Sequence, residues 1–393
     1  MTYKSILLPF TFYLFSFILT TLPSWGQTGS LSPYSRYGIG DLLQEGFTNQ
    51  SGMGGIGAGL SSYDHINFIN PASYVADTAT IFEFGARGEI RQLELGDETS
   101  TQNSASFSHF SLGFPIIKNK LSAALGLLPY SSVGYNIVVE DKNVPNIGNV
   151  SYKYEGVGGI NKVFVGAGLK LSKHLSGGIN VSYLFGTYEN VKSVEFPTGT
   201  NYFNSRYING ITVKGFYFNY GLLYEATLKN NLNFKAGLTG ALSTKVSAAN
   251  NQFYYNYVIS SFGGEIVKDS IYSEKEQNGS IKMPGQVKFG FTFSKSKWLA
   301  GADFSYSNWD KYESFNSKDD LKNSYIINAG GERKAGKLVY RIGGRYAKTY
   351  LNLKNTQLDD YGVTFGIGLL KSSPKRPPSS INLSVELGAK RYA

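Results

Sequence analysis

The segment that decides the fold is residues 82–91, which read Phe82-Glu83-Phe84-Gly85-Ala86-Arg87-Gly88-Glu89-Ile90-Arg91. In an extended strand, alternate side chains point to opposite faces. One face then carries the apolar side chains, and the other carries Glu83, Arg87, Glu89 and Arg91. Charges of both signs are costly in lipid, so we expect the apolar face to meet a membrane and the charged face to line a polar lumen.

The same period-two alternation recurs along the rest of the chain. It runs through 163–169, 179–185, 287–293, 338–346, 363–369 and 381–387, and Arg341 and Arg345 lie opposite the apolar positions of their segment. A water-soluble β-sandwich also alternates, with its apolar face inward, so a single strand does not separate the two architectures.

The connections between these segments do distinguish a barrel from a sandwich. Short polar turns at 118–120, 172–174, 229–231, 294–297 and 334–337 alternate with longer segments at 129–148, 192–205, 246–280 and 308–323. Short periplasmic turns alternating with long external loops are typical of outer-membrane barrels.

Residues 80–393 therefore predict an all-β fold, a transmembrane antiparallel up-and-down β-barrel of about 14 strands. About 13 strands are visible, and the last one begins at Ser380. Bacterial barrels usually have an even number of strands, and a C-terminal closing strand is missing here. Either the sequence is truncated at its C-terminus, which we favour, or the count is wrong by one.

The N-terminus predicts an exported protein. Lys4 precedes an apolar run at 6–22, and small residues at Ser24 and Gly26 mark a cleavage site, so 1–26 is expected to be a signal peptide cut near Gly26. The alternative is a retained membrane helix. The chain has no cysteine, which excludes a cysteine-linked lipid anchor and structural disulfides. The predicted location is the outer membrane of a gram-negative cell.

The net charge of +10 raises the question whether the protein binds nucleic acid. Many lysines fall in the short turns, and no basic cluster is interleaved with stacking aromatic residues. We therefore expect no nucleic-acid partner.

Residues 27–79 show glycine punctuation without sustained periodicity, which predicts an N-terminal hatch, or plug, in the lumen. Within it, Met53-Gly54-Gly55 is followed by Asn70-Pro71-Ala72. This arrangement resembles the FadL family of outer-membrane transporters for hydrophobic compounds, and also its secretion-accessory barrel relatives. The resemblance implies that these six residues belong to a hatch that moves to let apolar ligands pass. A static plug would use the same glycines and proline equally well.

The leading functional hypothesis is passive uptake of hydrophobic small molecules, such as long-chain fatty acids, through a hatch-gated lumen. An external loop rich in Phe253, Tyr254, Tyr255 and Tyr257 is expected to receive the ligand, although an interfacial aromatic girdle is an equal reading of these residues. The alternative is a non-transporting barrel that scaffolds a secretion or assembly machine and binds secretion-complex proteins. Further expected partners are outer-membrane lipid and, during insertion, the barrel assembly machinery.

No catalytic, cofactor or metal site is expected. The histidines His65, His109 and His174 show no metal-ligand spacing. Ser108 and His109 are adjacent in a strand, so their side chains are expected to face opposite ways. The pairs Asp319-Asp320 and Asp359-Asp360 are expected to be solvated acids of external loops rather than calcium ligands.

Overall fold

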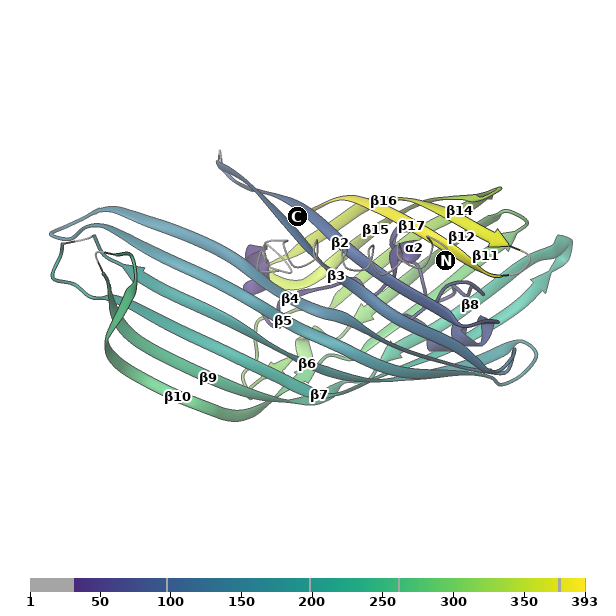
Figure 1. Cartoon of the computed structure of the whole chain (residues 1–393), viewed down its shortest axis with the longest axis horizontal. Helices are drawn as coiled ribbons and strands as arrows, with labels where there is room; N and C mark the ends of the chain where they lie inside the picture. Colours follow the sequence, from purple (N-terminus) through teal and green to yellow (C-terminus); the bar gives the residue numbers. More distant parts are fainter. Residues whose placement is uncertain (1–31, 97, 198, 261, 374–375, 393) are drawn as a thin grey trace, which may run out of the picture.

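The computed structural model describes residues 32–96, 98–197, 199–260, 262–373 and 376–392. One large antiparallel sheet curls into a barrel, and short N-terminal elements lie inside it (Figure 1). The predicted signal peptide and residues 27–31 lie outside the described residues. None of the helices in the described part of the chain is long and apolar enough to cross a membrane.

The elements follow the chain in a simple order. The plug contains η1 (Pro33–Arg36), β1 (Asp41–Leu42), α2 (Thr48–Ser51) and η2 (Pro71–Ala76). The wall begins with β2 (Ile81–Leu95), β3 (Glu98–Ile117), β4 (Leu121–Val144), β5 (Gly148–Lys170), β6 (Leu175–Glu195), β7 (Asn204–Leu228), η3 (Lys229–Asn231), β8 (Leu232–Ala241) and β9 (Thr244–Ile259). It continues with β10 (Glu265–Met283), β11 (Gln286–Lys295), β12 (Trp298–Ser307), η4 (Trp309–Lys311), β13 (Glu313–Ser314), β14 (Ser324–Ala335), β15 (Leu338–Leu353), β16 (Thr356–Ser373) and β17 (Arg376–Tyr392).

The strand pairing confirms the number of strands visible in the sequence. Of the 17 strands in the sheet, β1 belongs to the plug. β8 and β9 pair with successive parts of β7, so together they count as one interrupted strand of the wall. β10 with β11, and β12 with β13, continue each other in the same way. The described wall therefore has thirteen strands, and its first and last strands, β2 and β17, run in the same direction.

The alternation in residues 82–91 has the predicted sense. Phe82, Phe84 and Ile90 on β2 are 65%, 66% and 79% exposed, as expected for side chains that meet lipid. On the other face, Arg91 reaches a carboxylate of the plug. In this segment the apolar face therefore lies outside the barrel, and the charged face lies toward the lumen.

The wall is much taller on one side than on the other. β4, β5, β6 and β7 have 24, 23, 21 and 25 residues, whereas β12 and β14 have 10 and 12. About 9–11 residues suffice for a strand to cross a membrane. The tall side therefore extends well beyond the bilayer, and Figure 1 shows the hairpins β4–β5, β6–β7 and β9–β10 projecting at one end.

The prediction that the aromatic residues at 253–257 lie in an external loop is wrong. Phe253, Tyr254, Tyr255 and Tyr257 lie on β9, which pairs with β7 on one side and β10 on the other. Aromatic residues favour strands, and here the strand continues above the membrane. Tyr257 is fully buried, its hydroxyl donates to Glu195 Oε1 at 3.0 Å, and the Arg206 guanidinium lies 4.8 Å from its ring centre.

Candidate functional site

The Met53-Gly54-Gly55 motif lies in the lumen against the wall. The Gly54 N–H donates to Thr364 Oγ1 on β16 at 2.8 Å, and the Gly55 carbonyl accepts from Asn328 Nδ2 on β14 at 3.1 Å. Gly54 has a φ of +71°, and a Cβ there would lie 2.6 Å from the Gly344 carbonyl oxygen. Glycine is therefore required both by the backbone conformation and by the close approach to the wall.

The Asn70-Pro71-Ala72 motif begins η2 and joins the plug to the opposite part of the wall. Asn70 is fully buried, and its Oδ1 accepts from the Ala72 N–H at 3.1 Å, which caps the short helix. Its Nδ2 donates to the Ala58 carbonyl at 2.6 Å and to the Leu222 carbonyl on β7 at 3.1 Å. One amide side chain thus orders two plug segments and attaches them to the barrel.

Asp303 on β12 also holds the plug, and the sequence reasoning missed it. Its Oδ2 accepts from the N–H groups of Gly57 and Ala58 at 2.7 and 2.9 Å. The carboxylate is buried and lies between the outward-facing neighbours of an alternating strand. A lone inward acid on such a strand was the signal that could have identified it.

Lys162 on β5 is the second residue that contacts the plug and was not identified from the sequence. Its side chain is 1% exposed, and its Nζ lies 2.9 Å from Glu45 Oε1 of the plug and 4.4 Å from the centre of the Phe68 ring. Burial alone would raise the pKa of Glu45, but the charges of Lys162 and Lys288 hold it below its usual value. The plug is therefore attached to β5 by a buried ion pair.

The predicted lumen charges lie on the inner face of the wall. Arg341 Nε lies 3.1 Å from Glu332, and Arg345 lies 2.8 Å from Asp360 and 2.7 Å from Glu386. These pairs link neighbouring strands β14 to β17. Charged side chains of opposite sign thus neutralise one another within the lumen.

On β2, Glu83 contacts the plug. Its Oε1 lies 2.7 Å from His65 Nδ1, and this contact raises the pKa of His65 although burial opposes the change. Burial, together with the nearby Glu83 carboxylate, raises the pKa of Asp77 to about 8. Arg87 lines a small cavity against the plug loop that contains Glu45.

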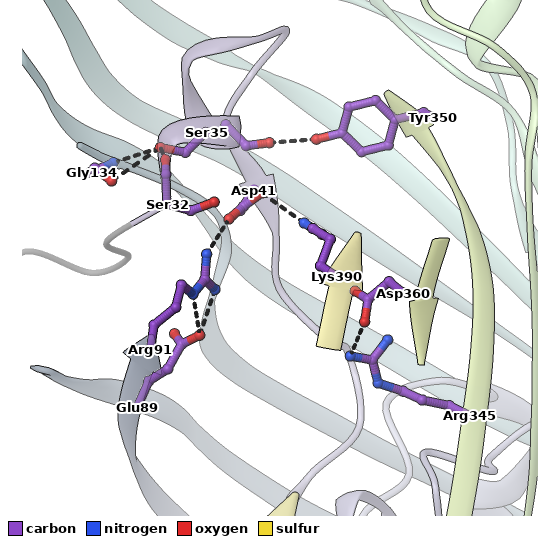
Figure 2. A network of polar contacts seen from close by, with 11 residues as sticks. Ser32, Ser35, Asp41, Glu89, Arg91, Gly134, Arg345, Tyr350, Asp360 and Lys390 are labelled. Carbon is purple, nitrogen blue, oxygen red and sulfur yellow. Dashed lines mark hydrogen bonds and ion pairs between the residues drawn. The ribbon is translucent and has the colours of Figure 1, made fainter. Parts of the chain in front are cut away.

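Asp41 of β1 bridges the two end strands of the wall (Figure 2). Its carboxylate lies 3.3 Å from Arg91 on β2 and 3.2 Å from Lys390 on β17, and Arg91 also binds Glu89 at 2.5 Å. Burial would raise the pKa of Asp41, but the two cations hold it below its usual value. β17 lies beside β2 in the order of the sheet, yet within the described residues no backbone register joins them. An ion-pair bridge from the plug therefore spans this seam.

A second discontinuity separates β3 from β4. The two strands pair only from Phe110, opposite Leu127, to Ile117, opposite Leu121, although both strands continue beyond Phe110 and Leu127. Beyond this point the edge of β4 pairs with the plug, Leu42 lying opposite Ser131.

The plug extends this contact on both sides of β1. The Leu43 N–H donates to the Tyr130 carbonyl at 3.1 Å, and the Ser32 N–H donates to the Gly134 carbonyl at 2.7 Å. A small cavity lies at the split, lined by residues that include Phe47, Phe107, Leu128 and Pro129. Plug residues 32–47 therefore cover the part of the β4 edge that β3 leaves unpaired.

The expectation that Ser108 and His109 face opposite ways is wrong. Ser108 Oγ lies 3.1 Å from His109 Nδ1, because the pairing of β2 with β3 shifts register at Gly85 and Ala86 and Ser108 has no partner there. The His109 ring stacks on Phe47 with ring centres 3.9 Å apart. Among the contacts of the described residues, none joins His109 to a carboxylate, and no group of three His, Cys, Asp or Glu that could hold a metal ion occurs there.

The barrel and its lumen-filling N-terminal segment define a plugged outer-membrane barrel of the FadL type. Solved structures share this fold. They include the CymD monoaromatic hydrocarbon channel, with a TM-score of 0.52 and 12% identity over 91% of this chain and 99% of that one. A FadL homologue of Pseudomonas aeruginosa matches with a TM-score of 0.56 and 12% identity over 90% and 91% of the two chains. The toluene transporter TodX of Pseudomonas putida gives a TM-score of 0.50 and 14% identity over 90% and 99%.

The family is established by sequence. The family model described as BamG matches residues 10–391, so the chain belongs to the BamG family. No curated protein matches the chain.

Proposed function

We propose that this protein is an outer-membrane channel for passive uptake of hydrophobic small molecules, such as long-chain fatty acids, in which plug residues 32–47 gate a lateral opening. The observation that carries the proposal is the split between β3 and β4, whose free strand edge is occupied by the plug. An apolar ligand that passes there enters the bilayer without crossing an aqueous space. CymD is a monoaromatic hydrocarbon channel and TodX is a toluene transporter, and their shared fold supports the same ligand class.

Two features of the split bear on its use as a gate: the lining of its cavity and the attachment of the plug to β4. Phe47, Phe107 and Leu128 give the small cavity at the split an apolar side, and the charged Glu45 and Arg87 line it as well. β1 pairs with β4 at only two positions, Asp41 and Leu42, and the N–H groups of Ser32 and Leu43 donate to β4 on either side of them. Opening therefore needs the release of a short segment rather than the unfolding of the wall.

A disulfide lock tests this gate. The chain has no cysteine, so the paired positions Leu42→Cys and Ser131→Cys create a single possible bond across β1 and β4. Cells that express the oxidised variant should take up labelled long-chain fatty acid at the rate of cells without the gene, and a reducing agent should restore uptake. A control lock between Ile367 and Leu383 on β16 and β17 should leave uptake unchanged. Equal uptake in the oxidised and reduced β1–β4 variant would contradict the proposal.

A second candidate function is a scaffold in a secretion or assembly machine, and the height of the wall favours it. Val138 and Val139 on β4 and Ile266 and Val267 on β10 are each about half exposed on the tall side of the barrel. Apolar side chains above the membrane suit a protein partner. The family description, BamG, fits the same hypothesis, with the barrel assembly machinery as partner.

Purification in a mild detergent distinguishes the two functions. A scaffold should be recovered with stoichiometric partners, and Val267→Asp should release them. A lone barrel that carries bound apolar ligand would favour uptake instead.

A further inference from the structure

The lipid-facing wall contains a hollow that the plug and the lateral opening do not explain. A groove of about 600 Å³ lies over β12, β14 and β15, and its lining includes Trp298, Ala300, Ala329, Gly331 and Ile342. The outward side chains of the flanking strand β11 are large, among them Phe289, Phe291 and Phe293, so a depression beside them needs a cause in the sequence.

Strand register supplies that cause. Two successive outward rows carry small residues, first Ala300 opposite Gly331, and then Ala302 opposite Ala329, which is opposite Gly344. Glycine and alanine expose little side chain, so these rows form a floor close to the backbone.

Large side chains surround this floor on every side. One end is closed by the row of Trp298, Arg333 and Tyr340, and the other end by the row of Phe304, Ile327 and Tyr346. The flanks are closed by Phe291 and Phe293 on β11 and by Val363 and Phe365 on β16. The hollow is therefore a bounded groove rather than a smooth part of the wall.

The plug accounts for the inward glycines of this region but not for the outward small residues. A Cβ on Gly330 or Gly343 would collide with the backbone at Met53 and Gly54, so both positions serve the plug. Ala300 and Ala329 are exposed and face away from the lumen. Their small size leaves space for a molecule in the membrane.

One end of the groove is strongly basic. The Arg333 guanidinium lies 4.9 Å from the centre of the Trp298 ring, at the level of the short turns that we place in the periplasm. Lys297 and Lys337 lie in these turns, and among the described residues no ion pair is recorded for either lysine or for Arg333. Glu332, the adjacent acid, faces inward and binds Arg341. Basic side chains at a membrane surface attract anionic lipid headgroups.

We propose that this groove is a specific site for an anionic phospholipid of the periplasmic leaflet. One acyl chain lies on the floor formed by Ala300, Gly331 and Ala329, and the phosphate lies against Arg333 and its neighbouring lysines. The Trp298 indole, 60% exposed, lies at the interface between the two parts of the lipid. This site is independent of the route proposed for the ligand.

Native mass spectrometry of the full chain in detergent tests the site, with dioleoylphosphatidylglycerol and dioleoylphosphatidylethanolamine as probes. We expect one tightly bound phosphatidylglycerol and at least tenfold weaker binding of phosphatidylethanolamine. Ala329→Phe should fill the groove and weaken phosphatidylglycerol binding tenfold or more. Arg333→Gln should remove most of the preference between the two headgroups.

Ala86→Phe on β2 is the matched control, because it adds the same ring to the lipid-facing surface away from the groove. It should bind phosphatidylglycerol like the unaltered protein. Circular dichroism before each titration verifies that every variant retains its strands. Equal binding of both phospholipids, unchanged binding by Ala329→Phe, or binding of oleate in place of phospholipid would each overturn the proposal.

Discussion

The buried pair of Lys162 and Glu45 gives a quantitative prediction for plug docking. Lys162→Met removes the ammonium and leaves the Glu45 carboxylate without its nearest cation. Loss of one partner from a buried ion pair costs about 3–5 kcal/mol. Because the Glu45 side chain is 21% exposed and also feels Lys288, the lower end applies, and we expect about 3 kcal/mol.

Hydrogen exchange measured by mass spectrometry reports this free energy. A loss of about 3 kcal/mol corresponds to roughly hundredfold faster exchange of plug amides in residues 43–60. Glu45→Gln combined with Lys162→Met should recover much of the protection, because the double variant leaves no unpaired charge.

The control for this prediction is Lys170→Met, also on β5. Its partner Glu225 lies 3.1 Å away, and the lysine side chain is 24% exposed, so the change should cost less than about 1 kcal/mol. Unchanged plug exchange in Lys162→Met would refute the reasoning. Equal acceleration in wall and plug peptides would also refute it, because the pair would then stabilise the whole barrel rather than the docked plug.

Three further changes test other contacts of the plug. Asp41→Asn removes the charge that bridges the seam, so the distance between spin labels on β2 and β17 should broaden, and an unchanged distribution would contradict the bridge. Burial and Glu83 raise the pKa of Asp77 to about 8, which favours the neutral acid in the folded state. Stability should therefore be fully present below the unfolded pKa near 4 and fall as pH rises toward 8. Asp77→Asn should raise the thermal midpoint at pH 8 but not at pH 4, and equal shifts at both would disprove this assignment. Gly54→Ala should destabilise plug docking by more than about 1 kcal/mol in a thermal melt. Gly96→Ala, which shares a positive φ but has no neighbour within 4 Å, should cost less, and equal losses would argue against the wall contact.

The wall was predictable because two solvents meet at each strand. Lipid on one side and a polar lumen on the other impose a period of two, which residues 82–91 show without any help from the rest of the chain. The same physics gave the count of thirteen strands. The alternation rule failed for residues 253–257, because above the membrane both faces of a strand meet similar surroundings. No period of two then distinguishes a paired strand from a loop.

The site was less predictable because its contacts join distant parts of the chain. Glycines at 54 and 55 indicated close approach, but nothing local specifies Thr364 or Asn328 as partners. The split between β3 and β4 depends on where pairing stops, and the alternation of β3 continues past that point. Asp303 and Lys162 were readable in principle as inward charges on alternating strands, although their partners were not.

The ion pairs and hydrogen bonds of the plug also constrain the order in which the molecule is assembled. The N–H of Gly54 reaches a residue 310 positions later in the chain, and Asp41 binds Lys390 near the last described residue. Contacts across such separations form slowly. A wall that closed first would shut out the segment that it must enclose. We therefore expect the plug, which precedes the wall in the chain, to be in place before β2 and β17 come together.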